Sequence, residues 1–231
     1  MASQSSIDSL PLFACLSETD RQELAKHAVE VPIQKGQFIF REGDPADWFH
    51  IVQHGNVKCV KSTPEGREVT LKVLMPGDLF CCEASAFSGD SHPGCAQSMG
   101  DGTVIKIHRT AMLEVIQRNP EAAVSIINYL SHRLRESQDN AKAFALDRAE
   151  QRVAAILVNL AERSGIQETR GLRISVRLTH QDLADMAGLT KETTSRILSR
   201  FKKEQLIAGH GKQLHILNLP HLQEMAPHAL P

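Results

Sequence analysis

The 231-residue sequence contains no long run of uncharged apolar residues, so no segment has the composition of a membrane span. Its first ten residues, MASQSSIDSL, lack the basic stretch and apolar core of a secretory signal. The length leaves room for two modest domains, and 42% apolar residues suffice to build their cores. These absences predict a cytoplasmic protein with no membrane partner.

The chain also lacks a strong overall charge, since its net charge is −1. The charge is unevenly distributed, however. Residues 148–219 hold 12 Lys and Arg against 7 Asp and Glu, whereas residues 1–147 hold 14 against 19. A basic C-terminal third is typical of proteins that bind a polyanion, although charge alone also allows a merely uneven surface.

Cysteines are few, and they are Cys15, Cys59, Cys81, Cys82 and Cys95. In a reducing compartment they are expected to be free, metal-bound or redox-active rather than joined in structural disulfides. The sequence shows no nucleophile with a matching base and no Gly-rich phosphate loop. It therefore does not predict an enzyme.

The N-terminal half predicts a small β-barrel or sandwich. Residues 10–30 predict a short helix with Ser17 as its N-cap. From Val31 to about Arg109, short runs rich in Val, Ile and Phe alternate with turn signals such as Pro76-Gly77-Asp78. The stretch Cys82–Ser88 interrupts this pattern and is expected to hold one helical turn.

A long helix is predicted from Asn119-Pro120 onward, with a spacing of three and four residues along one seam. The seam consists of Ile127, Leu130, Leu134, Ser137, Ala141 and Phe144. Such a helix either packs on its own domain or forms a two-stranded coiled coil between subunits. The narrow apolar seam and its charged flanks favour the dimer.

A second domain is expected after Asp147. Residues 148–164 predict a helix that stops at Gly165, and the alternation in residues 172–178 predicts a half-buried strand. The predicted domain limits are therefore 1–119 for the first domain, 120–147 for the long helix and 148–231 for the C-terminal domain.

Residues 178–207 predict a helix-turn-helix. Thr179 and Asp182 have the spacing of a capping box, Gly188 permits a tight turn, and Thr190 is the N-cap of a second helix running to about Gln205. Residues 206–207 and 214–217 then predict a β-hairpin, the wing of a winged helix.

The second helix of this motif has a polar face concentrated near its N-terminus, where recognition helices contact base edges. A charged helix face is often simply solvated, but Arg can pair with guanine and Glu with cytosine in the major groove. We expect Lys202 and Lys203 to contact phosphates. The predicted DNA-binding residues are Thr179, Thr190, Lys191, Glu192, Thr194, Ser195, Arg196, Arg200 and Lys202.

Three segments resemble the Crp/Fnr family of bacterial transcription regulators: KGQFIFREGDPADWFHIVQHGNVKCV, PEGREVTLKVLMPGDLF and the helix-turn-helix. The resemblance implies an α+β chain with an N-terminal cyclic-nucleotide-binding-type β-roll, a long dimerisation helix and a C-terminal winged helix-turn-helix. It implies a homodimer on palindromic double-stranded DNA, with RNA polymerase as a further partner of an activator. The Glu192-x-x-Ser195-Arg196 pattern resembles the Fnr type, which implies the inverted repeat TTGAT, four bases, ATCAA.

The effector type departs from the nucleotide-binding members of that family. Their phosphate cassette ends in Arg-Ser or Arg-Thr, whereas His92-Pro93 stands there in this chain. Without a fork-shaped cationic donor, cyclic nucleotide binding is not expected. Only Cys15 precedes the roll, so an Fnr-type iron–sulfur cluster, which needs about four ligands, is not expected either. A cyclic-nucleotide-binding subunit of a kinase or channel would leave residues 178–217 without a role.

The cassette instead holds a candidate effector set of Cys81, Cys82, Glu83, His92 and Cys95. These donors suit haem, a thiophilic metal ion or thiol redox chemistry. The carbon-monoxide-sensing haem member of the family has a Cys at a position similar to Cys81, but its His ligand would fall near Glu83. Two alternatives stay open: the cysteines are small packing residues and His92 lies on a loop surface, or the roll binds an unrelated small molecule.

Overall fold

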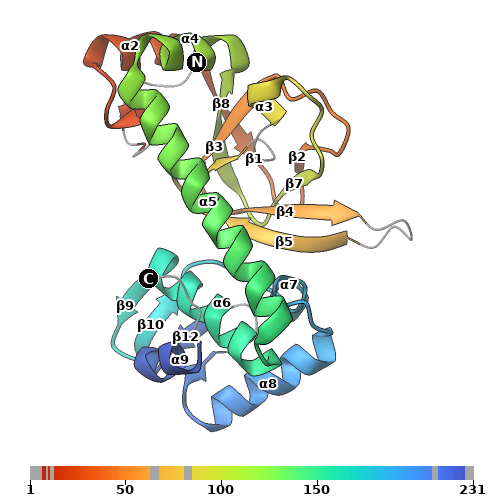
Figure 1. Cartoon of the computed structure of the whole chain (residues 1–231). Helices are drawn as coiled ribbons and strands as arrows, with labels where there is room; N and C mark the ends of the chain where they lie inside the picture. Colours follow the sequence, from red (N-terminus) through yellow and green to blue (C-terminus); the bar gives the residue numbers. More distant parts are fainter. Residues whose placement is uncertain are drawn as a thin grey trace. The chain divides into compact units, whose positions relative to one another are not determined.

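The computed structural model describes residues 7–8, 10, 13–62, 68–80, 85–209 and 213–226 (Figure 1). They form two compact units, residues 1–133 and 134–231, which divide within the long helix α5 (Pro120–Leu146). The limits 119 and 147 proposed from the sequence remain predictions. None of the helices in the described ranges is long and apolar enough to cross a bilayer.

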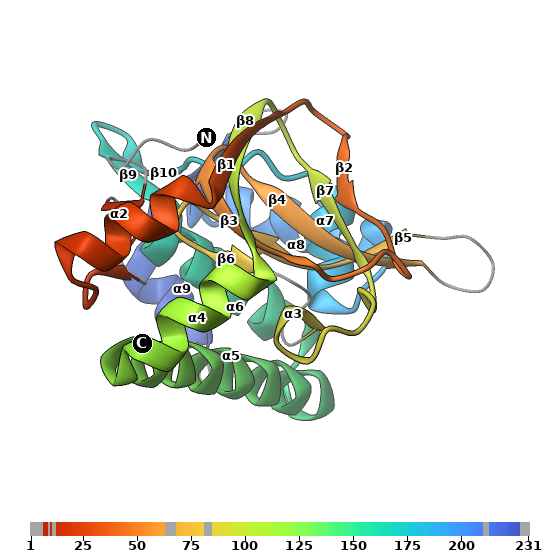
Figure 2. The same cartoon turned by 90° about the horizontal axis from the view of Figure 1, so that it is seen from above.

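The first unit contains two four-stranded antiparallel sheets (Figures 1 and 2). The strand orders are β1-β8-β3-β6 and β2-β7-β4-β5. This arrangement confirms the predicted β-roll. The strands are β1 (Ala28–Ile33), β2 (Phe38–Phe40), β3 (Trp48–His54), β4 (Val57–Ser62), β5 (Glu68–Leu74), β6 (Leu79–Phe80), β7 (Cys95–Ser98) and β8 (Gly102–His108).

The two faces of strand β3 pack into two different hydrophobic clusters. Successive side chains of a strand point to opposite faces. Phe49 and Ile51 enter a cluster with residues of the flanking helices, whereas Val52 enters a second cluster with residues of the other sheet. All three are at most 1% exposed, and burying each such side chain contributes about 1.5–3 kcal/mol.

The helices of this unit differ in part from the prediction. Helix α2 covers Glu18–Lys26, with the Ser17 hydroxyl accepting a hydrogen bond from the Asp20 N–H at 3.2 Å, so the cap is confirmed but the range 10–30 is too long. The chain turns into β1 at Ala28, where pairing with Ile107 begins. Helix α4 (Arg109–Arg118), which packs against α2, was not predicted; α3 (Ser85–Ser88) lies in the expected helical turn.

The second unit combines helices with a small antiparallel sheet of order β11-β12-β10-β9. Helix α6 ends at Ser164 with Gly165 as C-cap, as predicted. The strand expected over 172–178 is only Gly171–Ile174, because the chain then leaves the sheet for α7, and β9 was not predicted. The elements are α6 (Ala149–Ser164), β9 (Gly165–Glu168), β10 (Gly171–Ile174), α7 (His180–Ala187), α8 (Lys191–Lys203), β11 (Ile207–Ala208), β12 (Leu214–Ile216) and α9 (Leu219–Met225).

Candidate functional site

Helix α7 starts at the predicted capping box. The Asp182 carboxylate accepts hydrogen bonds from the Thr179 N–H at 2.9 Å and from the Thr179 hydroxyl at 2.6 Å. In return, the Thr179 hydroxyl oxygen accepts from the Asp182 N–H at 3.1 Å. These reciprocal bonds satisfy backbone donors that a helix start leaves open. The Thr179 side chain is therefore engaged in holding the start of α7.

The turn between α7 and α8 depends on Gly188, which has a φ of 60°. The Gly188 and Leu189 amides donate to the carbonyls of Asp185 and Ala184, at 3.1 and 2.8 Å. This closure needs a left-handed residue, which glycine adopts at little cost. Thr190 then caps α8 by accepting from the Thr193 N–H at 3.2 Å, so the predicted turn and cap are confirmed.

Helix α8 separates an apolar face from a polar one. Ile197, Leu198 and Phe201 are buried, whereas Lys191, Glu192 and Arg196 are exposed. Thr194 corrects the prediction, because it is 0% exposed and lies on the buried face. Thr194 is three and four residues from the buried Ile197 and Leu198, and this spacing places all three on the same face of the helix. Thr194 therefore cannot reach a base edge from this helix as folded.

The two arginines of α8 that were predicted to contact DNA differ in their surroundings. Arg200 donates to Glu150 Oε1 at 2.6 Å and to Glu204 Oε1 at 2.8 Å, and these carboxylates, Glu204 first, raise its pKa. The Arg196 side chain is exposed and makes no hydrogen bond or ion pair with any residue in the described part of the chain. The guanidinium of Arg196 is thus open to an outside partner, while that of Arg200 is already paired.

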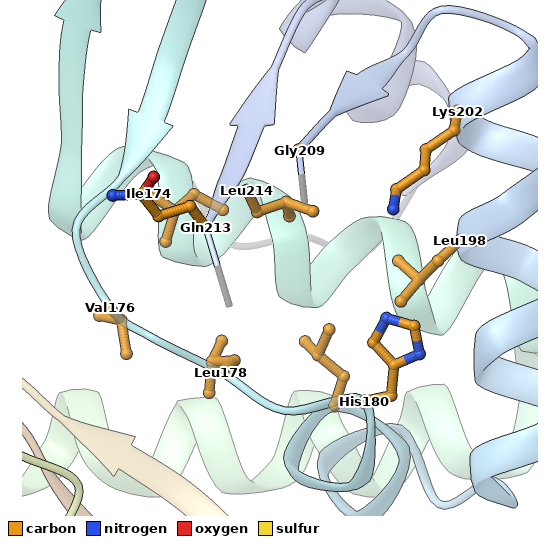
Figure 3. Close-up of a pocket in the computed structure, with 10 residues that line it drawn as sticks. Ile174, Val176, Leu178, His180, Leu198, Lys202, Gly209, Gln213 and Leu214 are labelled. Atoms are coloured by element: carbon orange, nitrogen blue, oxygen red, sulfur yellow. The ribbon is translucent and has the colours of Figure 1, made fainter. Parts of the chain in front are cut away.

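A contact that the sequence did not predict joins the two helices. The Nδ1 atom of His180, the first residue of α7, lies 2.8 Å from the Ser195 hydroxyl oxygen on α8. His180 also borders a groove that Figure 3 shows from close by, and its side chain and that of Lys202 are both directed into it. The groove is lined by Ile174, Val176, Leu178, His180, Leu183, Leu198, Lys202, Gly209, Gln213 and Leu214.

The seam predicted on α5 is an exposed apolar stripe in the single chain. Ile127 is 60% exposed, Leu134 61% and Phe144 49%, while Leu130 is half-buried. Ser137 and Ala141 are exposed along the same seam. Phe144 also packs within its own chain. Its ring lies so close to Gly188 that a Cβ added there would be 2.9 Å from it, and the Arg152 guanidinium lies 5.7 Å from the ring centroid. Large apolar side chains in such a row are expected to be covered by a partner.

His92, at the end of the cassette, points into the interior of the β-roll. His92 is 1% exposed and stacks on Phe40, with ring centroids 3.7 Å apart. His50 is also buried, with its ring 5.3 Å from those of Phe40 and Phe80. The expectation that His92 could be a surface residue of a loop is therefore wrong.

Burial governs the ionisation of both histidines, because a charged imidazole loses its hydration there. It lowers the pKa of His50 from 6.5 to about 3, with a further contribution from Lys106, and it also lowers the pKa of His92. Neither Nδ1 atom has a hydrogen-bond partner among the described residues. Burial therefore favours the uncharged form of both rings.

The candidate effector set is only partly placed. Cys95 is buried, and its sulfur accepts from the Glu42 N–H at 3.3 Å. Cys81, Cys82 and Glu83 lie outside the described residues. Within the ranges that are described, no three His, Cys, Asp or Glu side chains are grouped as metal ligands. The predicted metal, haem or thiol site thus stays a prediction.

Comparison with known proteins settles the family. Residues 30–119 match the model of the cyclic nucleotide-binding domain, and residues 151–225 match that of the Crp-like helix-turn-helix domain. The chain is 31% identical over 195 residues to the fumarate and nitrate reduction regulatory protein of Vibrio cholerae, covering 84% of this chain and 77% of that protein. The chain belongs to the Crp/Fnr family of transcription regulators.

Other Crp/Fnr members are similar over most of their length. The CRP-like cAMP-activated global transcriptional regulator of Mycobacterium tuberculosis is 30% identical over 203 residues, which are 88% of this chain and 90% of that one. The solved structure of FixK2 from Bradyrhizobium japonicum superposes with a TM-score of 0.77 at 26% identity, covering 86% and 97%. The present Crp/Fnr protein is accordingly a DNA-binding transcription regulator and not an enzyme.

Proposed function

We propose that this regulator binds DNA as a homodimer and places α8 of each subunit in successive major grooves about one helical turn apart. The observation that carries the proposal is the exposed, unpaired guanidinium of Arg196, one turn along α8 from the exposed Glu192. Arg can donate two hydrogen bonds to guanine O6 and N7, and Glu can accept from cytosine N4. Together they suit a G·C base pair.

The proposed operator is the inverted repeat TTGAT, four bases, ATCAA, which follows from the Glu192-x-x-Ser195-Arg196 pattern. Each half-site offers one G·C pair for these residues. Lys202 and Lys203 lie in the last turn of α8 and are assigned to phosphates. Arg200 is assigned a structural role because of its two carboxylate partners, and an activator of this kind would also contact RNA polymerase.

The proposed dimer interface is the stripe on α5. Exposed Ile127 and Leu134 would be covered by the same residues of a second copy, as in a coiled coil. The small Ser137 and Ala141 would let the two helices approach closely. A two-fold dimer matches a two-fold operator, so each subunit would contact one half-site.

The roll is proposed to work without a cyclic nucleotide. His92 occupies the cassette position of the phosphate-binding arginine, and its ring is stacked on Phe40, where burial lowers its pKa and so disfavours a positive charge. A cyclic phosphate would lack its bidentate cationic donor there. Haem, a thiophilic metal ion or an oxidant acting at Cys81 and Cys82 remains the proposed signal, tested by an absorption spectrum and metal analysis of the purified protein.

The operator is tested by fluorescence anisotropy of the full chain on a TTGAT repeat and on a duplex with both half-sites scrambled, at one fixed salt concentration. Specific regulators bind their site about 10³-fold or more tighter than other DNA. We expect at least that ratio, with two chains per duplex. Equal affinity for both duplexes would contradict the proposed operator.

A further inference from the structure

Ser195 follows Glu192 by three positions and directly precedes Arg196, the two exposed residues proposed to contact bases, and its hydroxyl oxygen lies 2.8 Å from Nδ1 of His180. Ser195 and His180 are both half-buried, so neither is simply a solvated surface group. The pair joins the start of α7 to the second turn of α8. It therefore fixes a side chain of the recognition helix from a neighbouring element.

A serine hydroxyl has one hydrogen to donate and two lone pairs that accept, and its hydrogen rotates to suit its partners. The nearby Ser199 hydroxyl donates to the Ser195 backbone carbonyl at 2.8 Å and so does not touch the Ser195 hydroxyl. Within the described part of the chain, His180 is the one hydrogen-bond partner of that hydroxyl. The imidazole alone thus determines which capacity of the hydroxyl is left for DNA.

We propose that His180 is a positioning residue for base recognition, which fixes the rotamer of Ser195 and the direction in which its hydroxyl hydrogen points. The inference rests on the proposed function, namely that α8 enters the major groove. It assigns to α7 a role in sequence preference in addition to supporting α8.

The direction of this hydrogen bond depends on the tautomer of His180. With the proton on Nδ1, the imidazole donates to the Ser195 oxygen, and Ser195 keeps its own hydrogen for an acceptor on a base edge, such as guanine N7 or thymine O4. With the proton on Nε2, Ser195 donates to Nδ1 and its oxygen is left to accept from a base donor such as cytosine N4. In both cases His180 decides which base edge Ser195 can recognise.

The test compares His180→Leu, His180→Asn and Ser195→Ala with the wild-type full chain. Affinity is measured on a panel of duplexes in which each base pair of one half-site is replaced in turn. His180→Leu and Ser195→Ala should lose about three- to tenfold discrimination at the same base pair, the equivalent of one hydrogen bond. The double variant should lose no more than either single one, and His180→Asn, whose amide can donate from a similar place, should retain most of the preference.

Two results would overturn the proposal. In the first, His180→Leu weakens binding by the same factor on every duplex, scrambled ones included, and reduces the salt dependence of the affinity. That is the behaviour expected when a phosphate contact is lost. In the second, both His180 variants keep the wild-type base profile. Melting temperatures are measured alongside, and if His180→Leu is unfolded, His180→Phe, which keeps a ring but has no hydrogen-bonding nitrogen, takes its place in the comparison with Ser195→Ala.

Arg196→Ala in the same panel separates this inference from the proposed function. If Arg196→Ala changes the profile and the His180 variants do not, the role of His180 is wrong while α8 still contacts the bases. If none of the variants changes the profile, α8 is not the recognition helix and both proposals fall.

Discussion

The outer surface of α8 and α5 and the interior of the β-roll both contain groups without partners, but in opposite surroundings. On α8 and α5 these groups are exposed: the Arg196 guanidinium has no partner among the described residues, and Leu134 is 61% exposed. In the interior of the roll they are buried: the Nδ1 atoms of His50 and His92 have no hydrogen-bond partner among the described residues.

Exposed and buried groups without partners have different consequences for folding and association. An exposed group without a partner costs folding little, and a second molecule such as DNA or another copy of the chain can supply what is missing. A buried polar group without a partner lowers the free energy of unfolding. Changes to the exposed groups should therefore alter association but not folding, and changes to the buried ones should do the reverse.

The largest effect is expected from Leu134→Glu on α5. Two like charges would face each other in an apolar interface, which costs several kcal/mol, so dimerisation and operator binding should be lost together. Sedimentation gives the mass and anisotropy gives the affinity. Because Leu134 is exposed in the single chain, the helical circular dichroism of the monomer should survive.

Gln138→Glu is the matched control, since it adds the same charge to an exposed position of α5 beside the seam. It should leave the dimer intact. A monomeric wild type at micromolar concentration, or a Leu134→Glu protein that is still dimeric, would show that the stripe is not the interface.

The next effect is a pH dependence of folding that comes from His50. Its pKa is about 3 when folded and 6.5 when unfolded, so below pH 6.5 the unfolded chain binds a proton that the folded chain excludes. The free energy of unfolding should therefore fall as the pH falls from 6.5 toward 3. The loss contributed by His50 is about 2–3 kcal/mol between pH 6.5 and pH 4.5.

His50→Leu removes the titrating group at similar volume, so its urea unfolding curves at these two pH values should differ by less than those of the wild type. The lowered pKa of His92 acts in the same direction and remains in both proteins. An identical acid loss in the variant would mean that His50 is hydrated in solution rather than buried.

A smaller effect is expected from Thr194→Val, which tests the comparison within α8 itself. The Thr194 hydroxyl is buried and its Oγ1 has no partner in the described structure. Removing it at nearly constant shape should raise the free energy of unfolding by about 1 kcal/mol. Operator affinity should not change, since the side chain lies on the buried face of α8. A loss of base preference with unchanged stability would return Thr194 to the DNA contacts.

Much of the helix-turn-helix could be predicted because its signals are local. The Thr179 and Asp182 capping box, the Gly188 turn and the Thr190 cap each depend on residues within five positions of one another. Thr194 is the exception, because its hydroxyl favours the polar face of α8 whereas its spacing from Ile197 places it on the buried face.

The remaining features depend on contacts between distant parts of the chain. Glu150 neutralises Arg200 from 50 positions away, and His92 is buried because Phe40, 52 positions away, stacks on it. The His180–Ser195 pair depends on how α7 and α8 cross. None of these follows from periodicity or propensity, which report only the local chain.

DNA recognition by α8 is tested most directly by the base preference of Arg196→Ala compared with that of Arg200→Ala. On the panel of half-site variants, Arg196→Ala should cost about 1–3 kcal/mol per half-site on the TTGAT repeat and lose the preference for the G·C pair. Arg200→Ala should keep the wild-type preference, because its guanidinium is paired with Glu150 and Glu204. If Arg196→Ala kept that preference, the exposed guanidinium would not be a base contact and the proposed recognition of DNA by α8 would be wrong.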